Sequence, residues 1–179
     1  MTGVPGSGKT TLGRALAGAL GATFVSLDTV KEELWPTSTW ADGWALRRAA
    51  EAEVLARAQA ADGDVVIDIW VAPGRDDARV SALFVDWPVP VVQVACVVTA
   101  DLAVGRYVAR DRSLGPHGPT DERLLQRIRD AVPLMGPLGP GPYLAVDTSA
   151  PVDVPALVTT LRAAGSTSVS PVNRGDPHL

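Results

Sequence analysis

Residues 3–10 read Gly3-Val4-Pro5-Gly6-Ser7-Gly8-Lys9-Thr10, and this stretch decides the fold that we expect for the chain. It fits the pattern G-x-x-x-x-G-K-[ST], in which a glycine-rich turn opens a helix. The glycines let the backbone curl tightly, so that consecutive N–H groups point inward toward a phosphate. The dipole of the helix that begins here also favours an anion. The stretch therefore predicts a P-loop that binds a nucleoside triphosphate.

The side chains of this loop have expected roles in nucleotide binding. Lys9 is predicted to reach the β- and γ-phosphate oxygens, and the Thr10 hydroxyl is predicted to ligate Mg²⁺. ATP and Mg²⁺ are therefore the expected ligands. We expect the nucleotide to contact residues along the loop and the first turn of the helix, namely Gly3, Pro5, Gly6, Ser7, Gly8, Lys9, Thr10 and Thr11.

The alternative interpretation is a glycine-rich turn with a chance Gly-Lys-Thr, and two observations argue against it. Only two of the sixteen basic residues are lysines, Lys9 and Lys31, so a lysine at this position stands out in a chain that otherwise carries arginine. The helix that the motif requires is also indicated. Apolar residues recur at helical spacing after the loop, at Leu12, Leu16, Ala19 and Leu20.

The composition predicts one globular, cytoplasmic domain. The chain has 179 residues, of which 46% are hydrophobic, and its formal net charge of −4 argues against general nucleic-acid binding. No apolar run approaches the ~20 residues of a membrane span, and no secretory signal is visible. The lone Cys96 lies in an apolar run, which excludes an internal disulfide and fits a reducing compartment.

Helical and strand-like patterns alternate along the chain. Strands are expected at 22–27, 65–71, 89–98 and 143–146. One helix is expected directly after the P-loop, and further helices are expected at 42–61, 75–86, 101–110, 121–132 and 154–164. This alternation predicts an α/β fold in which helices cover both faces of a parallel sheet. Ser, Thr, Pro, Asn and Gly dominate residues 165–179, which predicts a disordered tail.

Three aspartates, Asp28, Asp68 and Asp147, each close a predicted strand. Ligands of such folds bind at the carboxyl ends of the strands, so we expect all three carboxylates near the P-loop. Asp68 follows the apolar run Val65–Ile67, a pattern typical of a carboxylate that holds Mg²⁺ directly or through water. The alternative for Asp68 is a structural hydrogen bond to the loop backbone or to Thr10.

The order of elements resembles that of the small P-loop kinases, which include nucleoside monophosphate kinases, shikimate and gluconate kinases, chloramphenicol phosphotransferase and zeta-toxin-like kinases. The likeness covers residues 1–164, with a lid at about 105–130, although only the P-loop is a sharp motif. It implies a three-layer α/β/α fold with strand order 2-3-1-4-5. It also implies transfer of the γ-phosphoryl group of ATP to a hydroxyl of a small molecule. A nucleotide kinase and a non-enzymatic or slowly hydrolysing ATP-binding switch remain alternatives.

The resemblance assigns further residues to the site. Asp28 would orient the acceptor hydroxyl and can take its proton, whereas the alternative for Asp28 is to open a helix. Arg106 and Arg110, as catalytic residues, and Arg112 would close the lid on the phosphates, and the alternative is an ordinary charged helix face. Asp147 and Thr148 would lie beside the adenine.

The region that would bind the acceptor is less well defined by the sequence. Trp35, Trp40 and Trp44 could stack on a ring or pack in the core, and Arg47 and Arg48 could hold an anion or lie on a helix surface. The segment after the third predicted strand lacks the Asp-Gly-x-Pro-Arg pattern of nucleoside monophosphate kinases. This difference favours a metabolite, antibiotic or sugar-nucleotide acceptor over a nucleotide.

The P-loop begins at the third residue, so no strand of ordinary length precedes it. In the kinase fold that strand is central, and removing it would leave buried backbone groups unpaired, at a cost of ~1–3 kcal/mol each. We therefore expect the first strand to be truncated or missing. We also hypothesise that the natural reading frame begins upstream of Met1, with several apolar residues.

Overall fold

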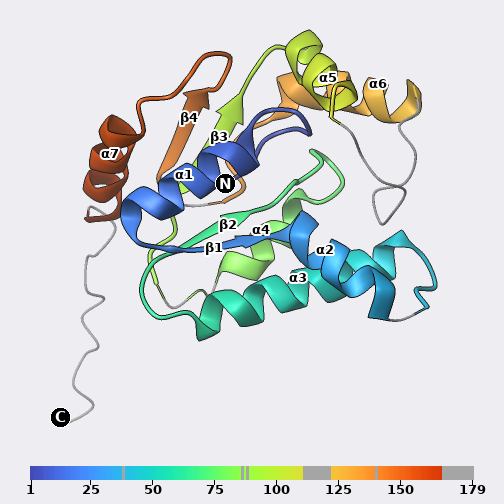
Figure 1. Cartoon of the computed structure of the whole chain (residues 1–179), viewed down its shortest axis with the longest axis horizontal. Coiled ribbons are helices and arrows are strands. Elements are labelled where there is room, and N and C mark those ends of the chain that lie inside the picture. The colour runs from blue at the N-terminus through green and yellow to red at the C-terminus, as the bar shows by residue number, and fades with distance from the viewer. Residues whose placement is uncertain (38, 86, 88, 111–121, 140, 167–179) are drawn as a thin grey trace, which may run out of the picture.

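The computed structural model describes residues 1–37, 39–85, 87, 89–110, 122–139 and 141–166. The strands within these residues are β1 (Thr23–Ser26), β2 (Val65–Asp68), β3 (Gln93–Val97) and β4 (Tyr143–Asp147). The α-helices are α1 (Lys9–Leu20), α2 (Leu27–Leu34), α3 (Gly43–Ala60), α4 (Asp77–Val85), α5 (Ala100–Val108), α6 (Glu122–Ala131) and α7 (Val154–Ser166). Short 3₁₀ turns occur at Trp35–Thr37 and Val132–Leu134. Figure 1 shows their arrangement.

The sheet consists of two parallel pairs that the first two residues of the chain join. β1 pairs with β2 and β3 pairs with β4, each in parallel. Met1 bonds to the β2 side and Thr2 bonds to the β3 side, so they occupy the position of a central strand. Four backbone hydrogen bonds make this join: Met1 N to Ile67 O (2.6 Å), Ile69 N to Met1 O (3.1 Å), Thr2 N to Val94 O (2.8 Å) and Cys96 N to Thr2 O (2.9 Å).

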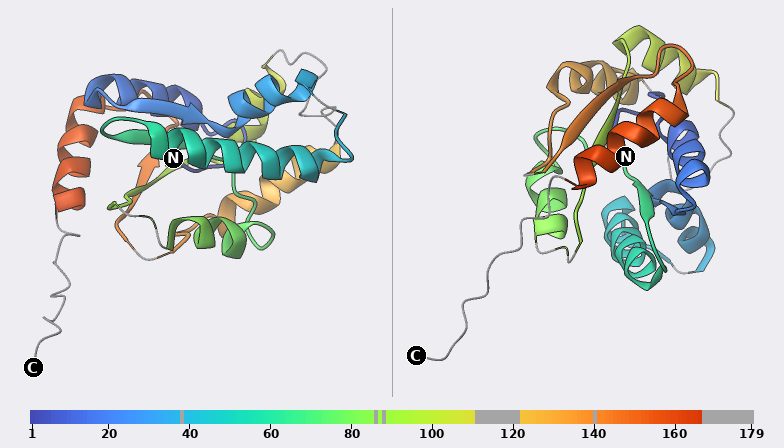
Figure 2. Two further views of the ribbon diagram at one scale, coloured as in Figure 1. Left: turned by 90° about the horizontal axis from the view of Figure 1, so that it is seen from below. Right: turned by 90° about the vertical axis from the view of Figure 1, so that its left-hand side faces the viewer.

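The resulting order is β1, β2, Met1–Thr2, β3, β4, which is the predicted 2-3-1-4-5 order with a first strand of two residues. The predicted truncation of that strand is therefore what the structure shows. Figures 1 and 2 place the N-terminus near the centre of the molecule in every view, as its position between β2 and β3 requires.

Helices cover both faces of the sheet, as predicted. On one face, α2, α3 and α4 pack against β1, β2 and the segment after β2, with Val25, Val54 and Val80 among the buried residues. On the other face, α1 and α7 pack against β3 and β4, where Leu16 and Cys96 are buried. A third cluster lies between the P-loop, α5 and α6. The fold is a three-layer α/β/α sandwich (Figure 2).

Several predicted boundaries are wrong. The strand expected at 65–71 ends at Asp68, and the strand expected at 89–98 covers only Gln93–Val97. The strand that was expected to run to Leu27 ends at Ser26, because the ladder with β2 ends at the pair Ser26–Asp68. Asp28 is therefore the second residue of α2 and does not close a strand. A helix that opens at Asp28 is the alternative stated above for this residue, and the helix observed buries Leu27 and Val30 against α3. At the other end of the chain, α7 continues to Ser166, past the expected start of the tail.

The central strands have the burial expected of a sheet covered on both sides. Val94, Ala95 and Cys96 are all buried, so β3 lacks the alternation of a strand with one solvent-exposed face.

None of the helices in the described residues is long and apolar enough to cross a membrane.

We predict that the Cys96 thiol is unreactive in the native chain. The residue is 3% exposed, and burial raises the pKa of its thiol to about 11, so almost no thiolate is present at pH 8. Iodoacetamide should label Cys96 much more slowly in the native chain than in urea, as mass spectrometry can measure. The free energy of unfolding should also fall as the pH rises from about 9 toward 11, because the unfolded thiol ionises first.

Cys96→Ala should lose this part of the pH dependence. Equal labelling rates in native and unfolded chain would contradict the buried position of the thiol.

Candidate active site

The P-loop backbone requires glycine at specific positions. Gly6 and Gly8 have φ of +84° and +85°, values that side chains other than glycine rarely adopt. A Cβ on Gly6 would lie 2.0 Å from the Ala103 carbonyl oxygen of α5, and a Cβ on Gly3 would lie 2.4 Å from Ser7 Oγ. The loop is therefore packed closely against α5, and its inner surface is formed by backbone.

Lys9 is the first residue of α1 and provides a buried positive charge at the loop. The residue is 7% exposed, and within the described residues no carboxylate forms an ion pair with it. The first turn of α1 carries no acidic residue and has no side-chain cap, so its backbone N–H groups are left for another acceptor. A buried cation and a free helix start together form a binding site for an anion such as a phosphate.

Asp68 joins the P-loop helix to the sheet. The Thr10 hydroxyl donates to Asp68 Oδ2 at 2.6 Å, and the Ser26 hydroxyl donates to the same oxygen at 3.3 Å. Asp68 is 3% exposed, and its Oδ1 is buried without a hydrogen-bond partner in the part of the chain that the structure describes. The contact with Thr10 is the alternative that the sequence left open.

This arrangement also fits a hard cation. Thr10 gives its proton to Asp68 and keeps its lone pairs, so its oxygen can still act as a ligand. The buried Oδ1 of Asp68 lacks a partner, which a bound cation or its water would supply. Thr10 and Asp68 thus provide oxygen atoms of the kind that Mg²⁺ prefers, next to the phosphate-binding loop.

Asp28 lies at the same edge of the sheet. It follows Ser26 by two residues, and the Ser26 hydroxyl bonds Asp68 at the end of the neighbouring strand. Asp28 is half-buried and sits in the first turn of α2, where a carboxylate is favoured by the helix dipole. The predicted helix-opening position and a role toward an acceptor are compatible at this point of the fold.

The loop after β4 is tied directly to the P-loop, a contact that the sequence did not indicate. The Thr148 hydroxyl donates to the Ser7 carbonyl at 2.5 Å, and Arg106 of α5 donates to the carbonyls of Thr148 (2.9 Å) and Ser149 (3.2 Å). A Cβ on Gly8 would lie 4.0 Å from Arg106 Nη1, so this guanidinium is beside the phosphate loop. Arg106 therefore links α5, the β4 loop and the P-loop.

The remaining predicted nucleotide-binding residues are in different positions. Asp147 is exposed, and hydrogen bonds from Ser149 lower the pKa of its carboxyl group. Arg110 is exposed just beyond the end of α5. Arg112 and the rest of residues 111–121 of the predicted lid lie outside the described residues. The carboxylate of Asp147 thus bonds its own loop at Ser149, whereas its neighbour Thr148 bonds the P-loop at Ser7.

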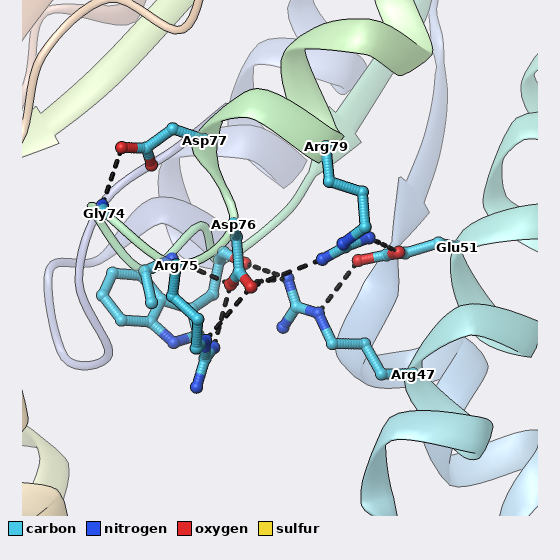
Figure 3. Close-up of polar contacts among 9 residues, drawn as sticks. Arg47, Glu51, Gly74, Arg75, Asp76, Asp77 and Arg79 are labelled. Atoms are coloured by element: carbon cyan, nitrogen blue, oxygen red, sulfur yellow. Dashed lines mark hydrogen bonds and ion pairs between the residues drawn. The ribbon is translucent and has the colours of Figure 1, made fainter.

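Arg47 belongs to a buried ion network that the sequence did not predict (Figure 3). It is 8% exposed, and its guanidinium contacts Glu51 at 2.9 Å, Asp76 at 3.3 Å and the Trp70 carbonyl at 2.7 Å. These partners bind Nε and Nη2 and balance the charge of the guanidinium, so Arg47 does not lie on the helix surface. The four-residue spacing of Arg47 and Glu51 is typical of an ion pair on a helix. No pattern in the sequence indicated the partners of Arg47 that follow β2.

Asp76 is the centre of this network. It is fully buried and receives hydrogen bonds from the Ala72 N–H and from Arg75, while Arg79 contacts both Asp76 and Glu51. Burial alone would raise the pKa of the Asp76 carboxyl, but the bonds from Arg75 and Ala72 and the charge of Arg47 hold it below its usual range. The network fixes the segment after β2 against α3.

The expected tryptophan cluster is mainly at the surface. Trp35 and Trp44 are 46% and 40% exposed, so neither packs in the core. Arg75 lies over the Trp44 ring at 5.0 Å from its centroid, and Arg79 lies at 5.9 Å. An exposed aromatic face with two guanidinium groups is thus placed on the α3–α4 side of the molecule.

Comparison with known proteins supports the fold. A family model described as an AAA domain matches residues 1–134. A candidate kinase from Chloroflexus aurantiacus is 26% identical, with a TM-score of 0.69, over 91% of this chain and 96% of that one. A shikimate kinase from Acinetobacter baumannii in complex with shikimate is 23% identical, with a TM-score of 0.60, over 94% and 93%.

A gluconokinase from Sinorhizobium meliloti is 23% identical, with a TM-score of 0.59, over 93% of this chain and 89% of that one. No curated protein matches the sequence. The predicted resemblance to small P-loop kinases and the predicted α/β/α fold are confirmed by these matches.

We predict that Gly6→Ala damages the loop whereas Gly18→Ala does not. The new methyl group on Gly6 would meet the Ala103 carbonyl, so the free energy of unfolding should fall by about 1–3 kcal/mol, and affinity for a fluorescent ATP analogue should fall with it. Gly18 lies within α1, and a Cβ added there would have no heavy atom within 4 Å, so alanine should raise the free energy of unfolding by about 0.5–1 kcal/mol. Equal effects of the two changes on urea unfolding would refute the close packing of Gly6.

The ion network gives a second pair of variants. Asp76→Ala should lower the free energy of unfolding by about 3–5 kcal/mol, because it leaves buried Arg47 without this carboxylate. Asp77→Ala, the matched control, removes one surface hydrogen bond to Gly74 and should cost about 1 kcal/mol. Urea unfolding followed by tryptophan fluorescence measures both, and a small effect of Asp76→Ala would show that the network contributes little.

Proposed function

This chain belongs to the AAA domain family, and from that premise we propose that it is a P-loop kinase that transfers the γ-phosphoryl group of ATP to a hydroxyl of a small molecule. The observation that carries the proposal is the buried Lys9 ammonium at the start of α1, next to the Thr10–Asp68 pair. An anion site and a cation site side by side are what a Mg²⁺-bound triphosphate requires.

The P-loop binds the phosphates through its backbone. The N–H groups of Gly6 and of Gly8 to Thr11 would donate to phosphate oxygens, while that of Ser7 bonds the Val4 carbonyl at 3.0 Å. Lys9 would neutralise the charge on the β- and γ-phosphates. These groups are held in place before the ligand arrives, because Gly6 is packed on α5 and Thr148 is bonded to Ser7. A rigid set of donors needs little reorganisation when charge develops on the transferring group.

Thr10 and Asp68 would hold Mg²⁺, Thr10 as a direct ligand and Asp68 directly or through water. When bound, Mg²⁺ would neutralise part of the negative charge of the phosphates. Asp68 also positions the Thr10 hydroxyl through the 2.6 Å hydrogen bond.

Asp28 would act on the acceptor. Its carboxylate can accept a hydrogen bond from the acceptor hydroxyl and take the proton as the new bond to phosphorus forms. Two similar structures support a small-molecule acceptor: one is named a shikimate kinase and holds shikimate, and the other is named a gluconokinase. The structure leaves an exposed face of Trp44 and Arg75 on the α3–α4 side, which could contribute to the acceptor site.

The arginines beyond α5 would complete the site. Arg106 would hold the nucleotide side of the P-loop through the carbonyls after β4, and Arg110 and Arg112 would close on the phosphates. Asp147 and Thr148 would line the adenine side, Thr148 through backbone next to Ser7.

The test is ATP consumption in the presence of panels of hydroxylated metabolites, antibiotics and nucleotides. One acceptor should stimulate turnover, and Asp28→Asn should lower kcat for it by about 10²–10⁴-fold while ATP affinity is retained. Asp101→Asn changes an exposed first-turn aspartate of α5 and serves as the matched control, with little expected effect. Slow turnover that no acceptor stimulates would favour the switch, and stimulation by a nucleotide alone would favour a nucleotide kinase.

A further inference from the structure

The ion network between α3 and α4 contains more positive charge than negative (Figure 3). It joins three guanidinium groups to two buried carboxylates, so its net charge is +1. Its members are Arg47, Arg75, Arg79, Glu51 and Asp76. Every oxygen of the two carboxylates already accepts a hydrogen bond from an arginine. The remaining positive charge therefore has no counterion within the network.

Arg75 is the member through which this excess charge reaches solvent. Its side chain is 42% exposed, whereas that of Arg47 is 10% exposed. Its Nε and Nη2 both donate to Asp76, at 3.1 and 2.8 Å, and its Nη1 has no hydrogen-bond partner in the part of the chain that the structure describes. The two bonds to one carboxylate fix the plane of the guanidinium, so Nη1 is a positioned donor that suits an anion.

Arg47 provides a second donor in the same network. Its Nε donates to Glu51 and its Nη2 to the Trp70 carbonyl, while its Nη1 has no hydrogen bond to any of the described residues. In Figure 3, the nitrogen atoms of Arg47 and Arg75 that carry no dashed line lie on the side of the network away from α4. Two unbonded donors are therefore presented on one side of Asp76.

The Trp44 ring forms a wall beside the arginines. The guanidinium carbon of Arg75 lies 5.0 Å from the centroid of this ring, and that of Arg79 lies 5.9 Å from it. The aromatic face restrains both side chains, and the solvent-exposed part of the ring offers an apolar contact to the carbon skeleton of a ligand. The site thus combines a positive charge with an apolar surface.

The network lies close to the edge of the sheet where the phosphates and the metal would bind. Trp70, whose carbonyl accepts from Arg47, follows Asp68 by two residues, so at most about 7 Å of backbone separates them. Asp68 in turn bonds Thr10 of the P-loop helix. Asp28 belongs to α2, which packs against α3, the helix that carries Arg47. A single small molecule is long enough to extend from this edge to the network.

We propose that Arg75, together with Arg47 Nη1 and the Trp44 ring, binds the carboxylate of a small hydroxylated monocarboxylic acid, and that this acid is the acceptor of the kinase. The acceptor role rests on the proposed function, whereas the binding site does not. A net charge of +1 matches a carboxylate better than a phosphate monoester, which carries about −1.5 to −2 at pH 7. The nearby Asp77 bonds the Gly74 N–H and points away from Arg47 (Figure 3).

The first experiment measures binding without ATP, by the change in tryptophan fluorescence. The probes are small hydroxylated monocarboxylates, each tested beside its own primary amide, which keeps the hydroxyl groups but removes the charge. At least one acid should bind about tenfold or more tightly than its amide. Phosphate monoesters of similar size form the third set. The proposal is overturned if no acid binds better than its amide, or if the phosphate monoesters bind better than the acids.

Variants of Arg75 separate ligand binding from a purely structural role. Arg75→Gln should weaken binding of the acid by about 10–100-fold and leave binding of its amide unchanged. Arg75→Lys keeps a positive charge beside Asp76 and thereby protects the fold, but it loses the planar fork, so it should weaken acid binding by a smaller factor. Arg48→Gln changes an exposed arginine of the same helix as Arg47 and should have no effect. Equal losses for acid and amide in both Arg75 variants would overturn the proposal.

A turnover assay distinguishes this proposal from the kinase activity itself. With ATP present, the acids that bind through Arg75 should stimulate ADP formation, and Arg75→Gln should raise KM for the acid while kcat is retained. Stimulation by uncharged acceptors alone would overturn the acceptor role of the acid and leave the kinase activity in place. Acid binding that depends on Arg75 but never stimulates ATP consumption would support the site and overturn both the acceptor role and the kinase activity.

Discussion

The backbone hydrogen bonds of Met1 and Thr2 are the constraint on which the rest of the structure depends. They join two separate strand pairs into one sheet and set the distance between β2 and β3. Because the P-loop begins at the next residue, the same bonds place the phosphate loop at the carboxyl edge of the sheet. The Asp68 side chain can then meet Thr10 from the end of the neighbouring strand.

Arg47 and Lys9 are both buried near this edge, but their charges are balanced in different ways. This difference indicates a structural role for Arg47 and a ligand-binding role for Lys9. Arg47 is surrounded by Glu51, Asp76 and a backbone carbonyl, so its charge is compensated within the fold. Lys9 has no carboxylate partner in the described part of the chain, so its compensation must come from a ligand or from water. A buried charge that lacks a partner is costly, and it is the feature most easily explained by a bound anion.

The sequence predicted the parts of the molecule that depend on local pattern. The glycines and Lys9 define the P-loop, and the alternation of apolar runs with helical segments gives the parallel sheet. It indicated α2 only as the alternative role for Asp28, because Leu27 and Val30 acquire their burial from α3. It also missed the bond between Thr148 and Ser7, whose partners are separated by 141 residues and carry no local signal. The roles assigned to Asp28, Arg110 and Arg112 remain predictions.

The same distinction explains why the phosphate side of the site can be read from sequence and the acceptor side cannot. Phosphates are bound mainly by backbone, and the glycine positions fix that backbone wherever the motif occurs. An acceptor is recognised by side chains, and here Trp44, Arg75 and the half-buried Arg79 are brought together by contacts between α3, α4 and the segment after β2. Arg75 and Arg79 also contact the buried Asp76, and Arg79 contacts Glu51, so both arginines belong to the network that holds these elements in place. A change at either arginine therefore alters the network as well, which is why no local pattern in the sequence marks these residues as an acceptor surface.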